Sequence, residues 1–269
     1  MSRLLLLLAF LLFASPAFGA WAFQNATAAL AHRSSGTTLV MSIPAENAEV
    51  GNVLICVLAT DNATSGDASD PTSNEHVSMT DDQSNTYVKL AEQRNGEANP
   101  NQGVTVSLWY ADITTQLTNS VDTITFTISD ARTAKSGACW EYTTGFTGTL
   151  VTKVGKDAVS TDADPANLTG ISGLDNVEHL WLRVDGKEDN GETWAADASA
   201  PAYTNRSVQC SSGGGADGNV CMFLDSLVLT ATSDGNLPTD ESDTYAAIFV
   251  ALDESAAPTG LANYMRIIN

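Results

Sequence analysis

The chain has 269 residues, of which 32 are Asp or Glu and 12 are Lys or Arg, giving a formal net charge of −20. Such a surface repels phosphate backbones and anionic lipid headgroups, which argues against nucleic-acid binding and against attachment to anionic membranes. The acidic residues are spread over many segments, as in a protein kept soluble by screened charges, and divalent-cation binding is the alternative interpretation.

The first twenty residues have the pattern of a secretory signal peptide. Arg3 supplies a positive charge, residues 4–14 are all apolar, and a proline and small residues follow at 15–20. As a helix the apolar run would rise about 16 Å, which is too short for a hydrocarbon core of about 30 Å. We therefore expect cleavage after Gly19 or Ala20, a secreted or surface-exposed mature protein, and no membrane insertion.

The mature chain alternates apolar and polar residues with a period of two, which predicts strands and almost no helix. Residues 53–59 (VLICVLA) are all apolar, as in a central strand covered on both faces. We expect a hairpin around residues 81–85, because Asp and Asn favour such turns. The predicted strands are 38–43, 53–59, 77–80, 87–93, 104–110, 123–129, 138–143, 151–159, 179–185, 206–210, 221–231 and 245–253.

These strands predict an all-β fold, an antiparallel two-sheet sandwich of the jelly-roll type. We find no linker and no internal sequence repeat, and only the stretch 145–148 marks a weak boundary. The expected organisation is therefore one domain over residues 21–255, followed by a C-terminal tail over residues 256–269.

Four cysteines in an exported chain predict two disulfides, with three possible pairings. Cys210 and Cys221 bracket a glycine-rich stretch that suits a stapled turn, which leaves Cys56 and Cys139 to pair with each other. A zinc site would need more Cys or His at short spacing, and a phosphate loop would need Lys and Ser or Thr after the glycines.

Several segments together resemble a group of secreted bacterial and phage-associated β-sandwich domains. They are GTTLVMSIPA, VGNVLICVLATDN, VSMTDDQSNTYVKL, GVTVSLWYADI, DTITFTISD, SGACWEYTTGF, HLWLRVDGKEDN and YAAIFVALDE, within residues 37–254. The chain departs from the group's pattern by lacking a turn glycine at 82–87 and by carrying Thr-Thr-Gly at 143–145. The resemblance implies a jelly-roll-like module of a virion, tail or exported surface protein, with no catalytic set to carry over.

The sequence contains no convincing catalytic motif. No G-x-S-x-G elbow occurs, and His32, His76 and His179 lie far apart, with His179 expected at the surface or rim. Glu141 is the best candidate for a catalytic carboxylate. It stands alone in its strand, however, so we expect it to accept hydrogen bonds from neighbouring backbone or hydroxyl groups.

Calcium and glycans are the remaining candidate ligands. Asp185, Glu188 and Asp189 supply oxygens of the kind that Ca²⁺ prefers, although no sequence matches the twelve-residue calcium loop. Trp109, Trp181 and Trp194 would form a platform for sugar rings if they are exposed, and otherwise they cover the sandwich. Trp109 lies on the polar face of its strand, so we expect it to be exposed.

The sequence thus favours a non-catalytic extracellular protein for surface attachment or assembly, as part of a virion or a cell surface. The first alternative is a carbohydrate-binding module, with or without calcium. A polysaccharide-degrading enzyme that uses Glu141 is the weaker alternative. The expected partner is a glycan or a protein at a surface, and homo-oligomerisation through a sheet edge is compatible with the pattern.

Overall fold

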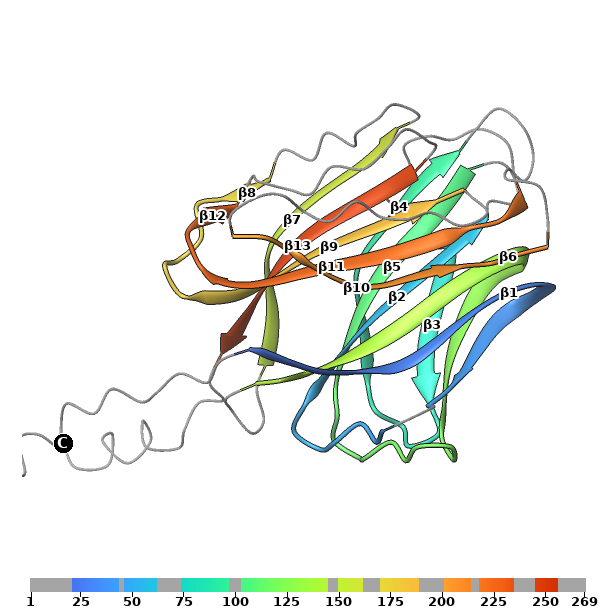
Figure 1. Ribbon diagram of the computed structural model, residues 1–269, viewed down its shortest axis with the longest axis horizontal. Helices are drawn as coiled ribbons and strands as arrows, with labels where there is room; N and C mark the ends of the chain where they lie inside the picture. The colour runs from blue at the N-terminus through green and yellow to red at the C-terminus, as the bar shows by residue number, and fades with distance from the viewer. Residues whose placement is uncertain are drawn as a thin grey trace, which may run out of the picture.

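The computed structural model describes residues 21–43, 46–61, 74–96, 103–144, 150–161, 170–188, 201–213, 218–234 and 245–255 (Figure 1). The proposed leader (1–20), the proposed tail (256–269), Asp189 and Trp194 lie outside these residues. The described residues form strands and no α-helix, so none of them forms a helix able to span a membrane.

Six strands form the first sheet, here called the N-sheet, in the order β1-β6-β2-β5-β4, with β3 paired to β6 off this path. All of these pairs are antiparallel. The strands are β1 (Ala22–Ser42), β2 (Val53–Asp61), β3 (His76–Asp81), β4 (Tyr87–Gly96), β5 (Gly103–Asp112) and β6 (Thr123–Thr143).

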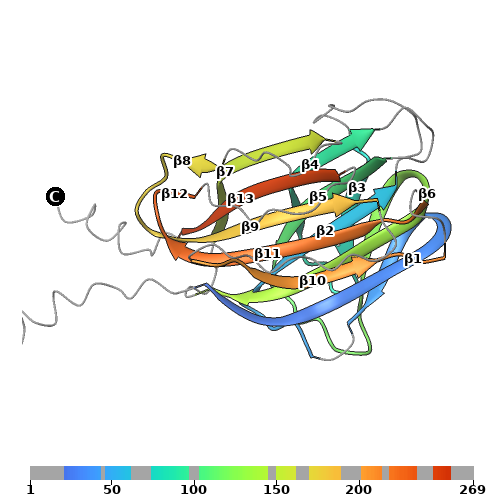
Figure 2. The same cartoon turned by 45° about the horizontal axis from the view of Figure 1, so that its top comes forward.

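Five strands form the second sheet, the C-sheet, in the order β10-β11-β9-β13-β7, and β8 and β12 make a small separate ladder. Figure 2 shows the C-sheet, yellow to red, lying over the N-sheet, blue to green. Alternate residues of both sheets meet in one apolar core, which includes Trp140, Leu182 and Ile248. The strands are β7 (Leu150–Thr161), β8 (Ile171–Ser172), β9 (Glu178–Lys187), β10 (Thr204–Cys210), β11 (Cys221–Thr230), β12 (Ser233–Asp234) and β13 (Tyr245–Ser255).

The predicted all-β, antiparallel two-sheet sandwich is confirmed, while its jelly-roll detail stays a prediction. Each sheet comes from one half of the chain, and the stretch 145–148 lies between the two halves. The two sheets also share one strand order. The five main strands in chain order are β1, β2, β4, β5 and β6 in the first half and β7, β9, β10, β11 and β13 in the second. Read from the edge strand β1 or β7, both sheets have the order first, fifth, second, fourth, third. The two halves therefore repeat one strand topology, although their sequences show no repeat.

The repeat extends to a small ladder beside each sheet. In the first half, Ala48 before β2 forms a bridge with Leu117 after β5. In the second half, β8 before β9 pairs with β12 after β11. Both halves thus use the same connection to tie the segment entering the second strand to the segment leaving the fourth.

The N-sheet carries an extra outer layer, made of residues 38–42 of β1, residues 123–128 of β6, and β3. β1 and β6 pair over nearly their whole lengths, but the ladder is irregular between Arg33 and Thr38. Figures 1 and 2 show both strands bending back at that end. The outer layer packs Leu39 and Phe126 onto the face of the N-sheet that points away from the C-sheet, in a second apolar core.

Two features position the outer layer. Lys135 is buried at the bend, where its ammonium donates to the carbonyls of Ser34, Gly36 and Arg132 at 2.6, 3.2 and 2.7 Å. Burial lowers the pKa of this ammonium, and the nearby Asp61 carboxylate opposes that change. At Gly137 a side chain would meet the outer layer, since a Cβ there would lie 2.9 Å from Leu39 Cδ2. The layer can approach this closely because residue 137 has no side chain.

Both predicted disulfides are confirmed. Cys56–Cys139 joins β2 to β6 in the second apolar core, and Cys210–Cys221 joins the ends of β10 and β11. The prediction that residues 53–59 are covered on both faces is also confirmed, because every residue of β2 is buried. The covering elements are the C-sheet on one face and the outer layer on the other.

The predicted hairpin at residues 81–85 is wrong. β3 pairs with β6 and β4 pairs with β5, so this turn carries the chain from the outer layer into the N-sheet. The turn itself uses the expected chemistry: Asp81 accepts hydrogen bonds from the backbone N–H groups of Gln83 and Asn85 at 2.9 and 3.1 Å, and Ser84 has a φ of 64°. Local turn residues therefore identified a turn without identifying what it joins.

Candidate functional site

The expected exposure of Trp109 is wrong. The residue does lie on the face of β5 opposite the main core, but that face is covered by the outer layer and Trp109 is only 4% exposed. Its ring meets Phe126 edge to face at 6.4 Å, and its Nε1–H donates to Ser107 Oγ at 2.7 Å. A ring in this position fills the second apolar core and presents no platform to a sugar.

Trp181 and His179 are also buried, so the surface or rim position expected for His179 is wrong. Trp181 stacks on Phe249 with ring centres 5.8 Å apart and donates from Nε1 to the carbonyl of Leu229. His179 meets Trp181 edge to face. These rings belong to a small apolar cluster on the outer face of the C-sheet, which also contains Tyr203. Trp194 lies outside the described residues.

The described part of the calcium candidate is occupied by an ion pair. Asp185 accepts from Arg183 through both carboxylate oxygens, at 2.8 and 3.3 Å, and both side chains are buried. Burial raises the pKa of Asp185, and the Arg183 guanidinium opposes that rise. A cation beside this guanidinium would be repelled. Glu188 is also buried, and Asp189 lies outside the described residues. No group of three acidic, His or Cys side chains among the described residues is placed to hold a metal ion.

A buried hydroxyl–imidazole cluster ties β3 to the N-sheet. His76 contacts Ser107 Oγ through Nδ1 at 2.6 Å and Thr60 Oγ1 through Nε2 at 3.0 Å. Burial, followed by the charges of Lys89 and Arg132, lowers the pKa of His76 well below its usual value. Ser107 and His76 have the residue types of a nucleophile and its base, but both are fully buried, so a substrate cannot reach them in this structure.

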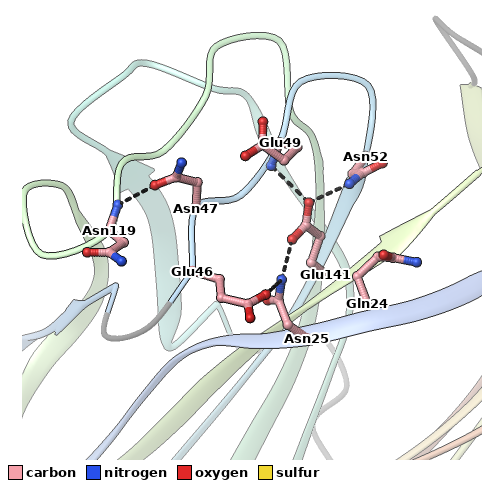
Figure 3. A pocket seen from close by; sticks show the side chains of 8 residues that line it. All are labelled: Gln24, Asn25, Glu46, Asn47, Glu49, Asn52, Asn119 and Glu141. Atoms are coloured by element: carbon pink, nitrogen blue, oxygen red, sulfur yellow. Dashed lines mark hydrogen bonds between the residues drawn. The ribbon is translucent and has the colours of Figure 1, made fainter.

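A polar hollow of about 400 Å³ opens at the edge of the N-sheet where β1 begins and β6 ends (Figure 3). Among the residues that the structure describes, every side chain that lines it is an amide or a carboxylate. They come from β1, from the segment between β1 and β2, from the segment after β5, and from β6: Gln24, Asn25, Glu46, Asn47, Glu49, Asn52, Asn119 and Glu141.

Glu141 is buried and forms the floor of the hollow. One carboxylate oxygen accepts from the backbone N–H of Glu49 at 2.8 Å and from Asn52 Nδ2, and the other accepts from Asn25 Nδ2 at 2.8 Å. The expectation that Glu141 accepts neighbouring backbone hydrogen bonds is confirmed, with amides in place of hydroxyls. With its oxygens engaged in this way, Glu141 holds β1 and the 46–52 segment in place around the hollow.

The segments 46–52 and 116–119 form the rim of the hollow, and hydrogen bonds join them to each other. Ala48 and Leu117 exchange two backbone hydrogen bonds at 2.9 and 3.1 Å, and Asn47 Oδ1 accepts from the backbone N–H of Asn119 at 2.9 Å. Gln116 donates to Glu49 Oε2. These bonds join the two segments on opposite sides of the Ala48–Leu117 bridge into one rim.

Of the eight residues that line the hollow, only Glu141 was predicted from the sequence as a candidate site residue. The available signal was the stretch ENAEVGN at 46–52, which places four amides or carboxylates within seven residues directly before a buried strand. Residues 24, 25 and 119 carry no local signal of their own. They join the site because β1 pairs with β6 and because the Ala48–Leu117 bridge closes the rim.

Comparison with known proteins adds no further assignment: no family model, curated protein or solved structure matches this chain. The resemblance to secreted bacterial and phage-associated sandwich domains stays a prediction. Within its described residues, the protein is an antiparallel β-sandwich with a polar hollow at the edge of the N-sheet.

Proposed function

We propose that this protein is an exported, non-catalytic attachment module that binds a glycan in the hollow lined by Gln24, Asn25, Glu46, Asn47, Glu49, Asn52, Asn119 and Glu141. Its proposed place is outside the cell, on a cell surface or a virion. The two disulfides are compatible with an oxidising compartment, and the leader-like residues 1–20 support export.

The observation that carries the proposal is the composition of the hollow. Eight amide and carboxylate side chains offer both donors and acceptors, which match the hydroxyl groups of a saccharide. A volume of about 400 Å³ falls within the usual range for small-molecule sites. None of the described residues that line the hollow is aromatic, so recognition by them would depend on hydrogen bonds to hydroxyls and not on stacking.

The support for an attachment role is the set of hydrogen bonds that joins the two rim segments and the full engagement of Glu141, the buried acid of the hollow. Glu141 is engaged by three donors, which suits a structural anchor better than an acid that must exchange protons with a substrate. The two rim segments are joined by the backbone hydrogen bonds between Ala48 and Leu117, which give the groups they carry a defined arrangement. These features favour recognition as the function of the hollow.

A glycan array probed with the purified mature chain tests the proposal. We expect at least one bound glycan, and we expect Asn47→Ala to weaken that binding about tenfold, because a lost hydrogen bond is equivalent to about 1–1.5 kcal/mol. Asn205→Ala is the matched control, since Asn205 is an exposed amide on β10, outside the hollow. Silence across a broad array, or equal losses in the two variants, would contradict the proposal.

A further inference from the structure

We propose that the hollow selects a saccharide that carries a protonated amine, an amino sugar with a free ammonium group. This inference rests on the proposed glycan-binding function and adds the charge class of the ligand. Its basis is an imbalance in the lining: three of the eight side chains are carboxylates, namely Glu46, Glu49 and Glu141, and none is Lys, Arg or His.

Two of these carboxylates line the hollow and use one oxygen each in a hydrogen bond. Glu46 accepts through Oε2 from Asn25 at 3.3 Å, and Glu49 accepts through Oε2 from Gln116. Within the part of the chain that the structure describes, no donor reaches either Oε1. Glu46 and Glu49 are exposed at the rim, whereas Glu141 lies buried beneath them. An ammonium group entering the hollow would find these two rim oxygens as acceptors.

An extended organic cation fits this arrangement better than a metal ion. Among the described residues no three His, Cys, Asp or Glu side chains are placed to hold one metal ion together, so the three carboxylates do not converge on a point. They are instead distributed around a hollow that also contains five amides. A ligand with one ammonium group and several hydroxyls uses both kinds of group at once.

The charge of the whole chain acts in the same direction. A net charge of −20 attracts cationic ligands to the surface and repels acidic glycans before contact. At the exposed rim, each carboxylate–ammonium pair is expected to contribute up to about fivefold in affinity, and added salt should reduce that contribution. Uronic acids and sulfated sugars should therefore be excluded.

The experiment is a calorimetric titration of the mature chain with four probes: a glucosamine tetramer, an N-acetylglucosamine tetramer, a galacturonic acid tetramer and tetralysine. We expect the glucosamine tetramer to bind most tightly, the acetylated tetramer more weakly and the acidic tetramer not at all. Glu46→Gln and Glu49→Gln should each lower the affinity for the glucosamine tetramer by up to about fivefold and leave the acetylated tetramer unchanged. Asp130→Asn is the control, because Asp130 is an exposed acid outside the hollow.

The outcomes separate this inference from the proposed function. Equal binding of the glucosamine and acetylated tetramers, unchanged by Glu46→Gln and Glu49→Gln, would overturn the amine selection and leave glycan binding in place. Tetralysine binding as tightly as the glucosamine tetramer would show recognition of charge alone and would also overturn it. If no saccharide probe binds here and the broad array is silent, both the inference and the proposed function fail.

Discussion

The two sheets share one strand order but treat their outer faces differently. The N-sheet covers its outer face with its own folded-back strands, which enclose the apolar core around the Cys56–Cys139 disulfide and, beside it, the buried ion pairs of Glu75 with Arg94 and Arg132. On the outer face of the C-sheet lie the buried Arg183–Asp185 ion pair and the rings around Trp181. Both outer faces therefore bury ion pairs beside apolar side chains, but within the described residues only the N-sheet covers them with its own folded-back strands.

The small ladders beside the sheets show the same contrast. The Ala48–Leu117 bridge is flanked by the amides and carboxylates of the hollow. The equivalent β8–β12 ladder is flanked by an apolar cluster that includes Ile171, Leu174 and Tyr203. Topology alone thus does not create the site; the polar residues that the first half places around its bridge create it.

The largest expected effect distinguishes the two disulfides. Replacing Cys56 and Cys139 by alanine should lower the free energy of unfolding by about 4.5 kcal/mol, because the bridge spans 83 residues. Replacing Cys210 and Cys221 should cost about 2.8 kcal/mol, because that bridge spans only 11. Urea unfolding of both variants measures this order, and an equal or reversed loss would contradict the chain-entropy explanation.

Breaking the buried ion pair tests the charged outer face of the C-sheet. Arg183→Met should cost about 3–5 kcal/mol at neutral pH, since it leaves the buried Asp185 carboxylate without its cation. A double variant that also carries Asp185→Leu should regain most of that stability. Relative to the unmodified protein, Arg183→Met should lose less stability at acidic pH than at neutral pH. Burial already raises the pKa of Asp185, and protonation removes the unpaired charge. A double variant as unstable as the single one would contradict this account.

Alanine substitutions at Gly186 and Gly137 compare how tightly the two apolar cores are packed. A Cβ at Gly186 would lie 2.9 Å from Val106 Cβ and 3.0 Å from Val104 Cγ2, atoms held close to the backbone. At Gly137 the closest atom is the tip of Leu39, at 2.9 Å, which can shift more easily. Both alanine variants should be destabilised by about 1–3 kcal/mol, with Gly186→Ala the worse. Thermal unfolding measures both variants, and a larger loss of stability in Gly137→Ala than in Gly186→Ala would contradict this expectation.

The smallest expected effect is a pH dependence of the outer layer. Burial lowers the pKa of His76 in the folded chain. Below pH 6.5 this imidazole is therefore protonated in the unfolded chain but stays neutral in the folded chain. The free energy of unfolding should therefore decrease as the pH falls from 6.5 to 5.5, by at most about 1.4 kcal/mol per pH unit for this one group. His76→Gln should flatten that part of the curve. A parallel curve for the variant would show that other groups cause the slope.

The sequence predicted the fold where the information was local. The apolar run at 53–59 identified a strand covered on both faces, and the spacing of the cysteines identified both disulfides. Alternation also placed Trp109 on the correct face of its strand. It could not show that a distant part of β1 and β6 folds back over that face, so the expected exposure was wrong.

The candidate site was less predictable for the same physical reason. Glu141 could be singled out as an isolated acid in a strand, but its partners Asn25 and Asn52 lie 116 and 89 residues away in the chain. Their meeting depends on the β1–β6 and β2–β6 registers, which period-two patterns do not specify. Identifying the hollow therefore required the pairing of strands as well as their positions.

Mapping the binding surface by NMR tests the central claim most directly. A chain of residues 21–269 would be titrated with the best glycan from the array, and backbone amide shifts would be followed in both halves. We expect the largest changes at residues 46–52 and 117–119 and at Glu141, with little change near the β8–β12 ladder. Changes concentrated around Trp181 and Tyr203, or spread evenly over both sheets, would contradict the assignment of binding to the hollow.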